Sequence, residues 1–139
     1  MKQNQITLLI IGIIIVVAII IFFVYQNKVK TKKAKALASE RRSVLEKDVE
    51  LMLNVTAGMT RHELIAMSAN DLAKLIDDYC EKKGGSSSEG TSLHLAGAWK
   101  HHIEDEGWTT DQYINNIIRW YIVHDFGEKM ADKIAPYMS

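Results

Sequence analysis

An uncharged apolar run from Ile6 to Val24 limits what this chain can fold into more than any other feature. Sixteen of its nineteen residues are Ile, Leu, Val or Phe. At about −0.3 to −0.6 kcal/mol each on the membrane-insertion scale, these sixteen contribute roughly −5 to −10 kcal/mol. A helix of this length is about 30 Å long, which matches the hydrocarbon thickness of a bilayer. The sequence therefore predicts one transmembrane helix, with Ile6, Ile14 and Val24 at its start, middle and end.

The flanks of this run predict its direction in the membrane. Only Lys2 and the α-amine lie on the N-terminal side, whereas seven Lys and Arg lie within about 20 residues on the other side. Positively charged flanks stay in the cytoplasm, so we expect a single-pass signal anchor with a cytoplasmic C-terminal part. A basic segment beside the bilayer also attracts anionic headgroups. The residues expected to do so are Lys28, Lys30, Lys32, Lys33 and Lys35.

The net charge of zero hides a division of the chain into a basic and an acidic part. Residues 1–42 hold eight Lys and Arg against one Glu, whereas residues 43–139 hold nine Lys and Arg against sixteen Asp and Glu. The net charges of the two parts are therefore +7 and −7. Nucleic-acid binding requires a basic face, so the acidic part is not expected to bind nucleic acid.

The composition after the anchor predicts an all-α protein in three parts. These are the tail and anchor (residues 1–27), a basic juxtamembrane helix (28–57) and a small acidic helical domain (58–139). The juxtamembrane part has no Pro or Gly before residue 58 and is rich in good helix formers. Its apolar stripe includes Leu37, Val44, Leu45 and Leu51, with polar interruptions. This stripe fits either self-association or packing against the protein's own domain.

Capping signals divide the distal domain into a bundle of about five helices. Thr60 and Ser68 each precede an acidic residue at the third position, which is typical of helix N-termini. Thr109 or Thr110 has the same role before a central apolar helix that ends at Gly127. Residues 84–92 have the composition of a flexible loop. No segment alternates with a period of two, so no sheet is expected.

Aromatic residues are concentrated at the C-terminal end of the chain. All three tryptophans, Trp99, Trp108 and Trp120, lie in the last third of the sequence. They fit either the core of a small domain or a partner-binding surface, where Trp is enriched. Trp108 follows a glycine between two expected helices, so it is predicted to be the most exposed of the three.

The candidate for metal chemistry is a histidine and carboxylate cluster. On an α-helix, His101 would share a face with Asp105, and His102 with Glu106, because each pair is four residues apart. Imidazole and carboxylate groups are metal ligands, but the paired patterns of known zinc sites are absent. A solvated face with local ion pairs explains the same residues. The sequence therefore predicts no cofactor and no catalytic residue, with His101, His102 and Glu106 as the metal candidate.

Three functions are consistent with these features. The first is a non-enzymatic, membrane-anchored module that regulates or binds another protein or a second copy of the chain. The second is a structural subunit of a larger membrane or envelope assembly, in which the anchor itself is the interface. The third is a membrane-tethered enzyme or sensor that uses the histidine and carboxylate cluster to hold a metal ion.

Overall fold

The computed structural model describes residues 2–84 and 91–138, and every regular element among them is helical. This confirms the predicted all-α class. The expected loop at residues 84–92 lies mostly outside the described residues. The elements are α1 (Lys2–Thr56), α2 (Arg61–Ala66), α3 (Ala69–Lys83), α4 (Ser92–Trp99), the π-helix η1 (Lys100–Asp105), α5 (Thr110–Phe126), α6 (Glu128–Ile134) and the 3₁₀-helix η2 (Ala135–Tyr137).

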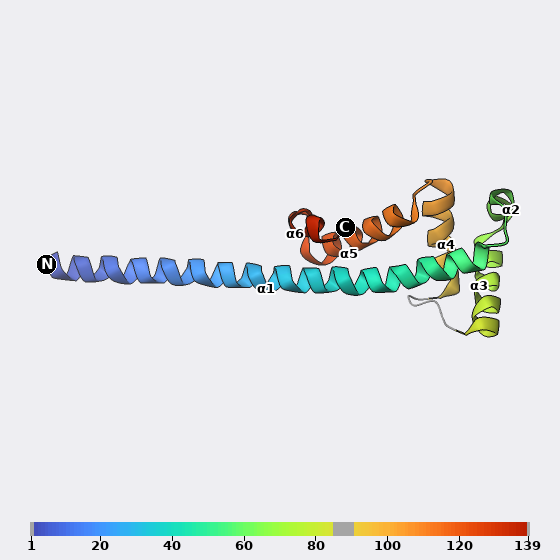
Figure 1. Ribbon diagram of the computed structural model, residues 1–139. Coiled ribbons are helices and arrows are strands. Elements are labelled where there is room, and N and C mark those ends of the chain that lie inside the picture. The colour runs from blue at the N-terminus through green and yellow to red at the C-terminus, as the bar shows by residue number, and fades with distance from the viewer. Residues whose placement is uncertain (1, 85–90, 139) are drawn as a thin grey trace.

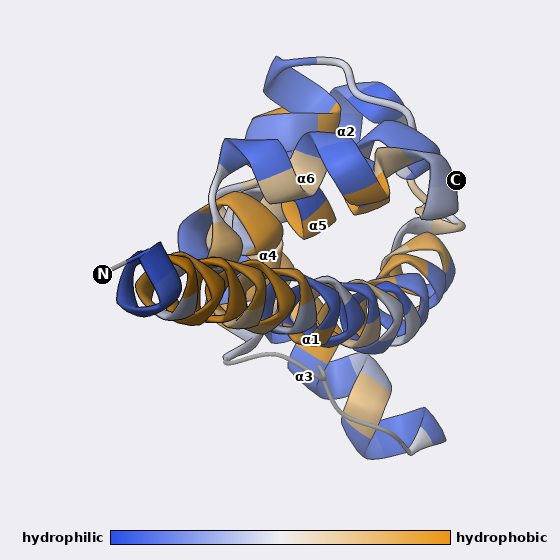
Figure 2. Cartoon of the chain, turned by 90° about the vertical axis from the view of Figure 1, so that its left-hand side faces the viewer, coloured by the Kyte–Doolittle hydropathy of each residue, from blue (hydrophilic) through white to orange (hydrophobic). Residues whose placement is uncertain are grey.

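A single uninterrupted helix, α1, forms both the apolar rod (residues 6–24) and the longest helix of the bundle. Its first half extends away from the other helices, which gather around its second half (Figure 1). α5 runs back along this second half, and α3 packs mainly against α4. Figure 2, which looks along α1, shows the apolar residues as a continuous orange section in front of a bundle with a largely polar exterior.

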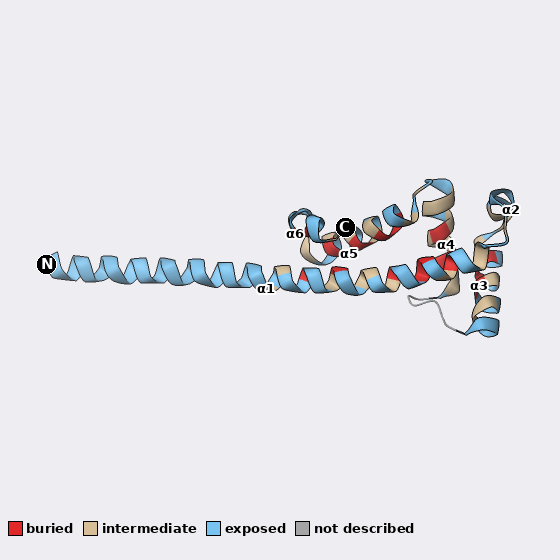
Figure 3. Cartoon of the chain, viewed as in Figure 1, coloured by how far each residue is buried: buried red, intermediate tan, exposed pale blue. Residues whose placement is uncertain are grey.

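The apolar part of α1 is long and apolar enough to cross a membrane, and none of it is buried. Ile6, Ile14 and Val24 are 56%, 61% and 49% exposed. A core helix of a soluble protein would instead bury at least one face of such a segment. Figure 3 shows this contrast as a uniformly exposed section of α1 followed by a section with a buried stripe.

The second half of α1 belongs to the hydrophobic core. Ala34, Ala38, Leu45, Val49 and Met52 are all buried there. The apolar stripe of this segment therefore packs against the protein's own domain, which was one of the two interpretations left open. α1 ends at Thr56, one residue before the predicted boundary, but its second half packs with the helices that follow as one unit.

The remaining core residues come from the short helices and α5. α5 contributes Tyr113, Ile114, Ile118 and Ile122, which recur at helical spacing on the face that meets α1. The other buried apolar residues are Leu72, Ala73, Ile76, Leu95, Ala96, Trp99, Ala131 and Ile134.

Side-chain caps fix where the short helices begin, as the sequence indicated. The hydroxyls of Thr60 and Ser68 accept hydrogen bonds from the third backbone N–H of α2 and α3. Thr109 forms a complete capping box with Gln112 at the start of α5. Gly127 has a φ of 90°, which L-residues rarely adopt, and this allows the sharp turn from α5 to α6.

Candidate functional site

The site is built on a turn of π-helix that continues directly from α4. In η1 the backbone N–H of Glu106 donates to the carbonyl of His101, five residues earlier, at 3.0 Å. A π-turn is wider than an α-turn, so residues five apart share a face. Such turns are uncommon and occur frequently at functional sites. Here the wider turn changes which side chains meet.

The π-turn brings two histidines to one carboxylate. His101 Nε2 lies 3.0 Å from Glu106 Oε1, and His102 Nδ1 lies 3.6 Å from Glu106 Oε2. One ligand atom from each of the three residues lies within 4.8 Å of the other two. The predicted pairing of His102 with Glu106 is therefore present, whereas His101, which was predicted to pair with Asp105, meets Glu106 instead. The pairing of His101 with Glu106 follows from the π-helical register.

A tryptophan covers this histidine pair on one side. Gly107 has a φ of 73° and turns the chain, and the Trp108 backbone N–H then donates to the His102 carbonyl at 2.9 Å. As a result the Trp108 and His102 rings stack, with centroids 4.2 Å apart and an interplanar angle of 8°. The His102 ring also meets the ring of the buried Tyr113 edge to face, with centroids 6.1 Å apart, so the stack is in contact with the core.

Beside this stack, a cleft opens between α4 with η1 and the middle of α5. Its volume is about 450 Å³. Its walls combine aromatic rings with a few polar groups, which is the composition of many binding sites. The lining residues are His94, Ala98, His102, Trp108, Asn116, Ile117, Trp120 and Tyr121.

The three tryptophans have different environments, and the prediction that Trp108 is the most exposed is wrong. Trp99 is a core residue, 3% exposed, and Trp108 is half-buried against His102. Trp120 is 60% exposed, although it lies on α5, which contributes four buried residues to the core. It stacks on His124, with centroids 5.3 Å apart, and meets the edge of Tyr121. The structure therefore places Trp108 and Trp120 in the cleft and Trp99 in the core, against Tyr113.

The floor of the cleft continues toward a buried carboxylate of α1. A smaller cavity of about 50 Å³ shares four lining residues with the cleft and is also lined by Asp48 and Tyr113. Asp48 is 3% exposed, and the Arg41 guanidinium lies 4.3 Å from the centroid of the Tyr121 ring. Arg41 and Asp48 are the residues that interrupt the apolar stripe of α1. These two polar residues in an apolar stripe were the sequence signal for a polar contact. The sequence alone did not indicate that α5 makes this contact.

Tyr113 gives this region a specific pH dependence. Its burial, together with the nearby charge of Asp48, raises the pKa of Tyr113 from 10.0 to about 12. Below pH 10 the phenol is protonated in both the folded and the unfolded chain. Above pH 10 the unfolded chain releases this proton first, so the free energy of unfolding falls.

We therefore expect Tyr113→Phe to reduce the alkaline loss of stability. At pH 11 the raised pKa should cost the wild-type chain about 1.4 kcal/mol that the variant does not lose. Urea titrations of both chains in mild detergent at pH 9 and pH 11 measure the difference. Other titrating groups are common to both chains and cancel. An identical pH dependence in the two chains would contradict the expectation.

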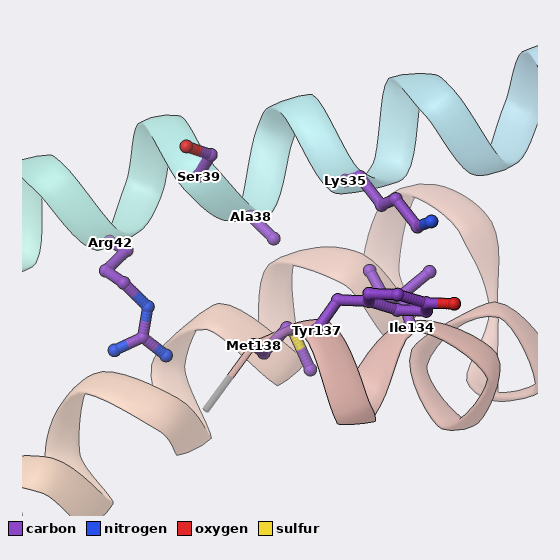
Figure 4. A pocket seen from close by; sticks show the side chains of 7 residues that line it. All are labelled: Lys35, Ala38, Ser39, Arg42, Ile134, Tyr137 and Met138. Atoms are coloured by element: carbon purple, nitrogen blue, oxygen red, sulfur yellow. The ribbon is translucent and has the colours of Figure 1, made fainter.

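A second cavity lies near the end of the bundle that faces the apolar rod. Figure 4 shows Lys35, Ser39 and Arg42 of α1 on one side, opposite residues near the C-terminus of the chain. Its volume is about 290 Å³. The Lys35 ammonium lies 3.7 Å from the centroid of the Tyr137 ring, and Arg42 donates to Asn115 at 2.6 Å. Both cations are therefore held by the protein itself.

Comparison with known proteins returned no relative. No protein-family model matches the chain, and no curated protein sequence or solved structure matches it significantly.

Proposed function

We propose that this protein is a single-pass membrane-anchored module whose helical bundle lies in the cytoplasm and binds another protein through the cleft. The observation that carries the proposal is the arrangement of the aromatic rings. Trp120 is an exposed ring that lines the cleft, while Trp108 and Tyr121 form half-buried walls. Large rigid rings at the centre of a concave surface are typical of binding hot spots.

The exposed apolar rod supports the anchor. All the residues from Ile6 to Val24 are exposed, and in water they would form one large apolar surface. A bilayer removes this surface from water while the helix satisfies its own backbone groups. The continuity of α1 then sets the position of the bundle. Ala34, the first buried residue, lies ten residues beyond Val24, or about 15 Å along the helix.

The positive charges along the stalk, which we define as residues 25–35 of α1, support a cytoplasmic location of the bundle. Lys28, Lys30, Lys32 and Lys33 are exposed between the apolar rod and Ala34, and Lys35 is exposed directly after it. Each such residue contributes about 1 kcal/mol of attraction when it lies near an anionic membrane surface. The stalk would therefore hold anionic headgroups, while the acidic bundle projects beyond them. Lys35 differs from the other four lysines, because its ammonium lies over the ring of Tyr137.

The partner proposed for the cleft is a protein segment that inserts apolar or aromatic side chains. The cleft is large enough for more than one side chain, and Ile117, Ala98 and the rings provide most of its walls. His94 and Asn116 are exposed at the rim and can hydrogen-bond to a partner's backbone. The proposed role is binding, with no catalytic residue assigned.

We expect Trp120→Ala to weaken this association by tenfold or more, since a tryptophan that acts as a binding hot spot contributes at least about 2 kcal/mol. Chemical crosslinking in native membranes, followed by quantitative mass spectrometry, identifies the partner and measures its capture by each variant. Tyr137→Ala is the matched control, because Tyr137 is 70% exposed but lies outside the cleft.

Two outcomes would count against the cleft. One is equal capture by the wild-type chain and Trp120→Ala. The other is capture that persists in that variant through crosslinks in the apolar rod, which would favour a structural subunit held in an assembly by its anchor. Because Trp120 is exposed, its replacement should change the free energy of unfolding by less than about 1 kcal/mol. A loss of binding can therefore be separated from a loss of folding.

A further inference from the structure

We infer that His101, His102 and Glu106 form a binding site for a divalent transition-metal ion at the edge of the cleft. This inference does not depend on the proposed protein partner. It rests on the geometry of η1, on one buried nitrogen atom and on the chemistry of the three ligands.

The first argument is the geometry that the π-turn creates. An α-helix separates residues 101 and 106 by five positions and turns them to different faces, whereas η1 brings their side chains to 3.0 Å. The two imidazole rings lie edge to face, with centroids 4.7 Å apart, so their nitrogen atoms converge on the same carboxylate. An ion pair on a helix surface does not require a π-turn, since positions four apart already meet.

The second argument is the state of His102. Its Nδ1 atom is buried and has no hydrogen-bond partner within the described part of the chain, because 3.6 Å to Glu106 Oε2 is too long. A buried polar atom without a partner costs about 1–3 kcal/mol. Stacking on Trp108 fixes the plane of the ring. A metal ion between the three residues would use this atom as a ligand.

The third argument is the identity and spacing of the ligand atoms. Two imidazoles and one carboxylate suit Zn²⁺ and its neighbours in the first transition row, and they do not suit Mg²⁺ or Ca²⁺, which prefer oxygen ligands. Metal–ligand bonds of about 2.1 Å place tetrahedral ligand atoms about 3.4 Å apart. The ligand atoms of the three residues lie within 4.8 Å of one another, so the widest pair would have to approach by at most about 1.4 Å. The exposed side chain of His101 and the partly exposed one of Glu106 can make this movement.

The proposed metal site and the cleft share a residue. His102 is both a ligand and a lining residue, and its ring stacks on Trp108, another lining residue. Three protein ligands leave at least one coordination position open for water or for a donor group of a bound molecule. A bound ion would therefore fix the position of the Trp108 wall.

Calorimetric titration of the untagged full-length chain with ZnCl₂ in mild detergent tests the inference. We expect one ion per chain, and we expect Glu106→Gln and His101→Ala each to weaken binding by tenfold or more. His62→Ala is the matched control, because His62 is an exposed histidine of α2 outside the cluster. It should bind zinc as the wild-type chain does.

Two further measurements separate a loss of ligands from a loss of folding. Zinc should raise the melting temperature of the wild-type chain by several degrees and that of Glu106→Gln by clearly less, since the stabilisation falls as the affinity for the folded state falls. Bound Co²⁺ should give visible absorption in the wild-type chain that the Glu106→Gln variant lacks. Failure to bind zinc at millimolar concentration, or equal affinity in the wild-type chain and both cluster variants, would overturn the inference.

Discussion

A chain that begins at Lys28 is expected to fold, whereas a chain that begins at Gly58 is expected to remain unfolded. The difference lies in the second half of α1, which contributes five buried apolar residues to the core. Three of them, Leu45, Val49 and Met52, have large side chains whose burial contributes about 1.5–3 kcal/mol each. Their loss amounts to about 5–9 kcal/mol. The whole free energy of unfolding of a small domain is about 5–15 kcal/mol.

Circular dichroism and thermal unfolding of the two truncated chains measure this effect. The chain of residues 28–139 should be helical and melt cooperatively, because it loses no buried residue. It also serves as the control, since it shows that removal of the apolar rod alone is tolerated. A cooperative melt of residues 58–139 would mean that the short helices form a core without α1.

Local signals in the sequence predicted much of this fold. Thr60, Ser68 and Thr109 cap the helices that they were expected to begin, and Gly127 ends α5. These features depend on the nearest four residues, so they can be recognised without knowledge of the tertiary structure. The apolar period of α5 likewise predicted its central position.

The cleft could not be predicted, because its residues meet only through tertiary packing. Trp120 lies two residues after the buried Ile118, yet the face of α5 that meets α1 excludes it. Trp108 follows a turn glycine, yet it is held by a ring whose position depends on the π-turn. A π-turn adds one residue to a helical turn, and no residue in KHHIED signals that insertion. The sequence therefore predicted the pairing of His102 with Glu106, but it paired His101 with Asp105 and not with Glu106.

The continuity of α1 changes how the two halves of the molecule are related. A flexible linker would let the bundle turn freely beneath the membrane, whereas one helix transmits the orientation of the anchor to the core. The side of α1 that faces α5 is buried from Ala34 onward, so the same helix determines where α5 and the cleft point. In the proposed membrane setting, α6 is the short helix nearest the bilayer, since it packs at the end of the bundle that faces the rod (Figure 1).

The proposed anchor makes a prediction with a large effect. Replacement of Ile13, Ile14 and Val17 by lysine is expected to move the protein from the membrane fraction to the soluble fraction. Lysine at the centre of a span costs about 2.5–3.5 kcal/mol, and each replaced residue also loses its own favourable contribution. The three changes together add about 8–12 kcal/mol. The apolar run as a whole contributes only roughly −5 to −10 kcal/mol, so insertion would no longer be favourable.

Fractionation of cells after a carbonate wash, followed by immunoblotting, measures the distribution. The matched control replaces the same three residues by leucine, which keeps the span apolar and should leave the protein in the membrane. The bundle should fold in both variants, because these positions are exposed and make no contribution to the core. Near-identical circular dichroism of the two bundles would confirm this. If the lysine variant stays in the washed membranes with its bundle folded, the apolar run is not the anchor, and the stalk lysines or the cleft must hold the protein there instead.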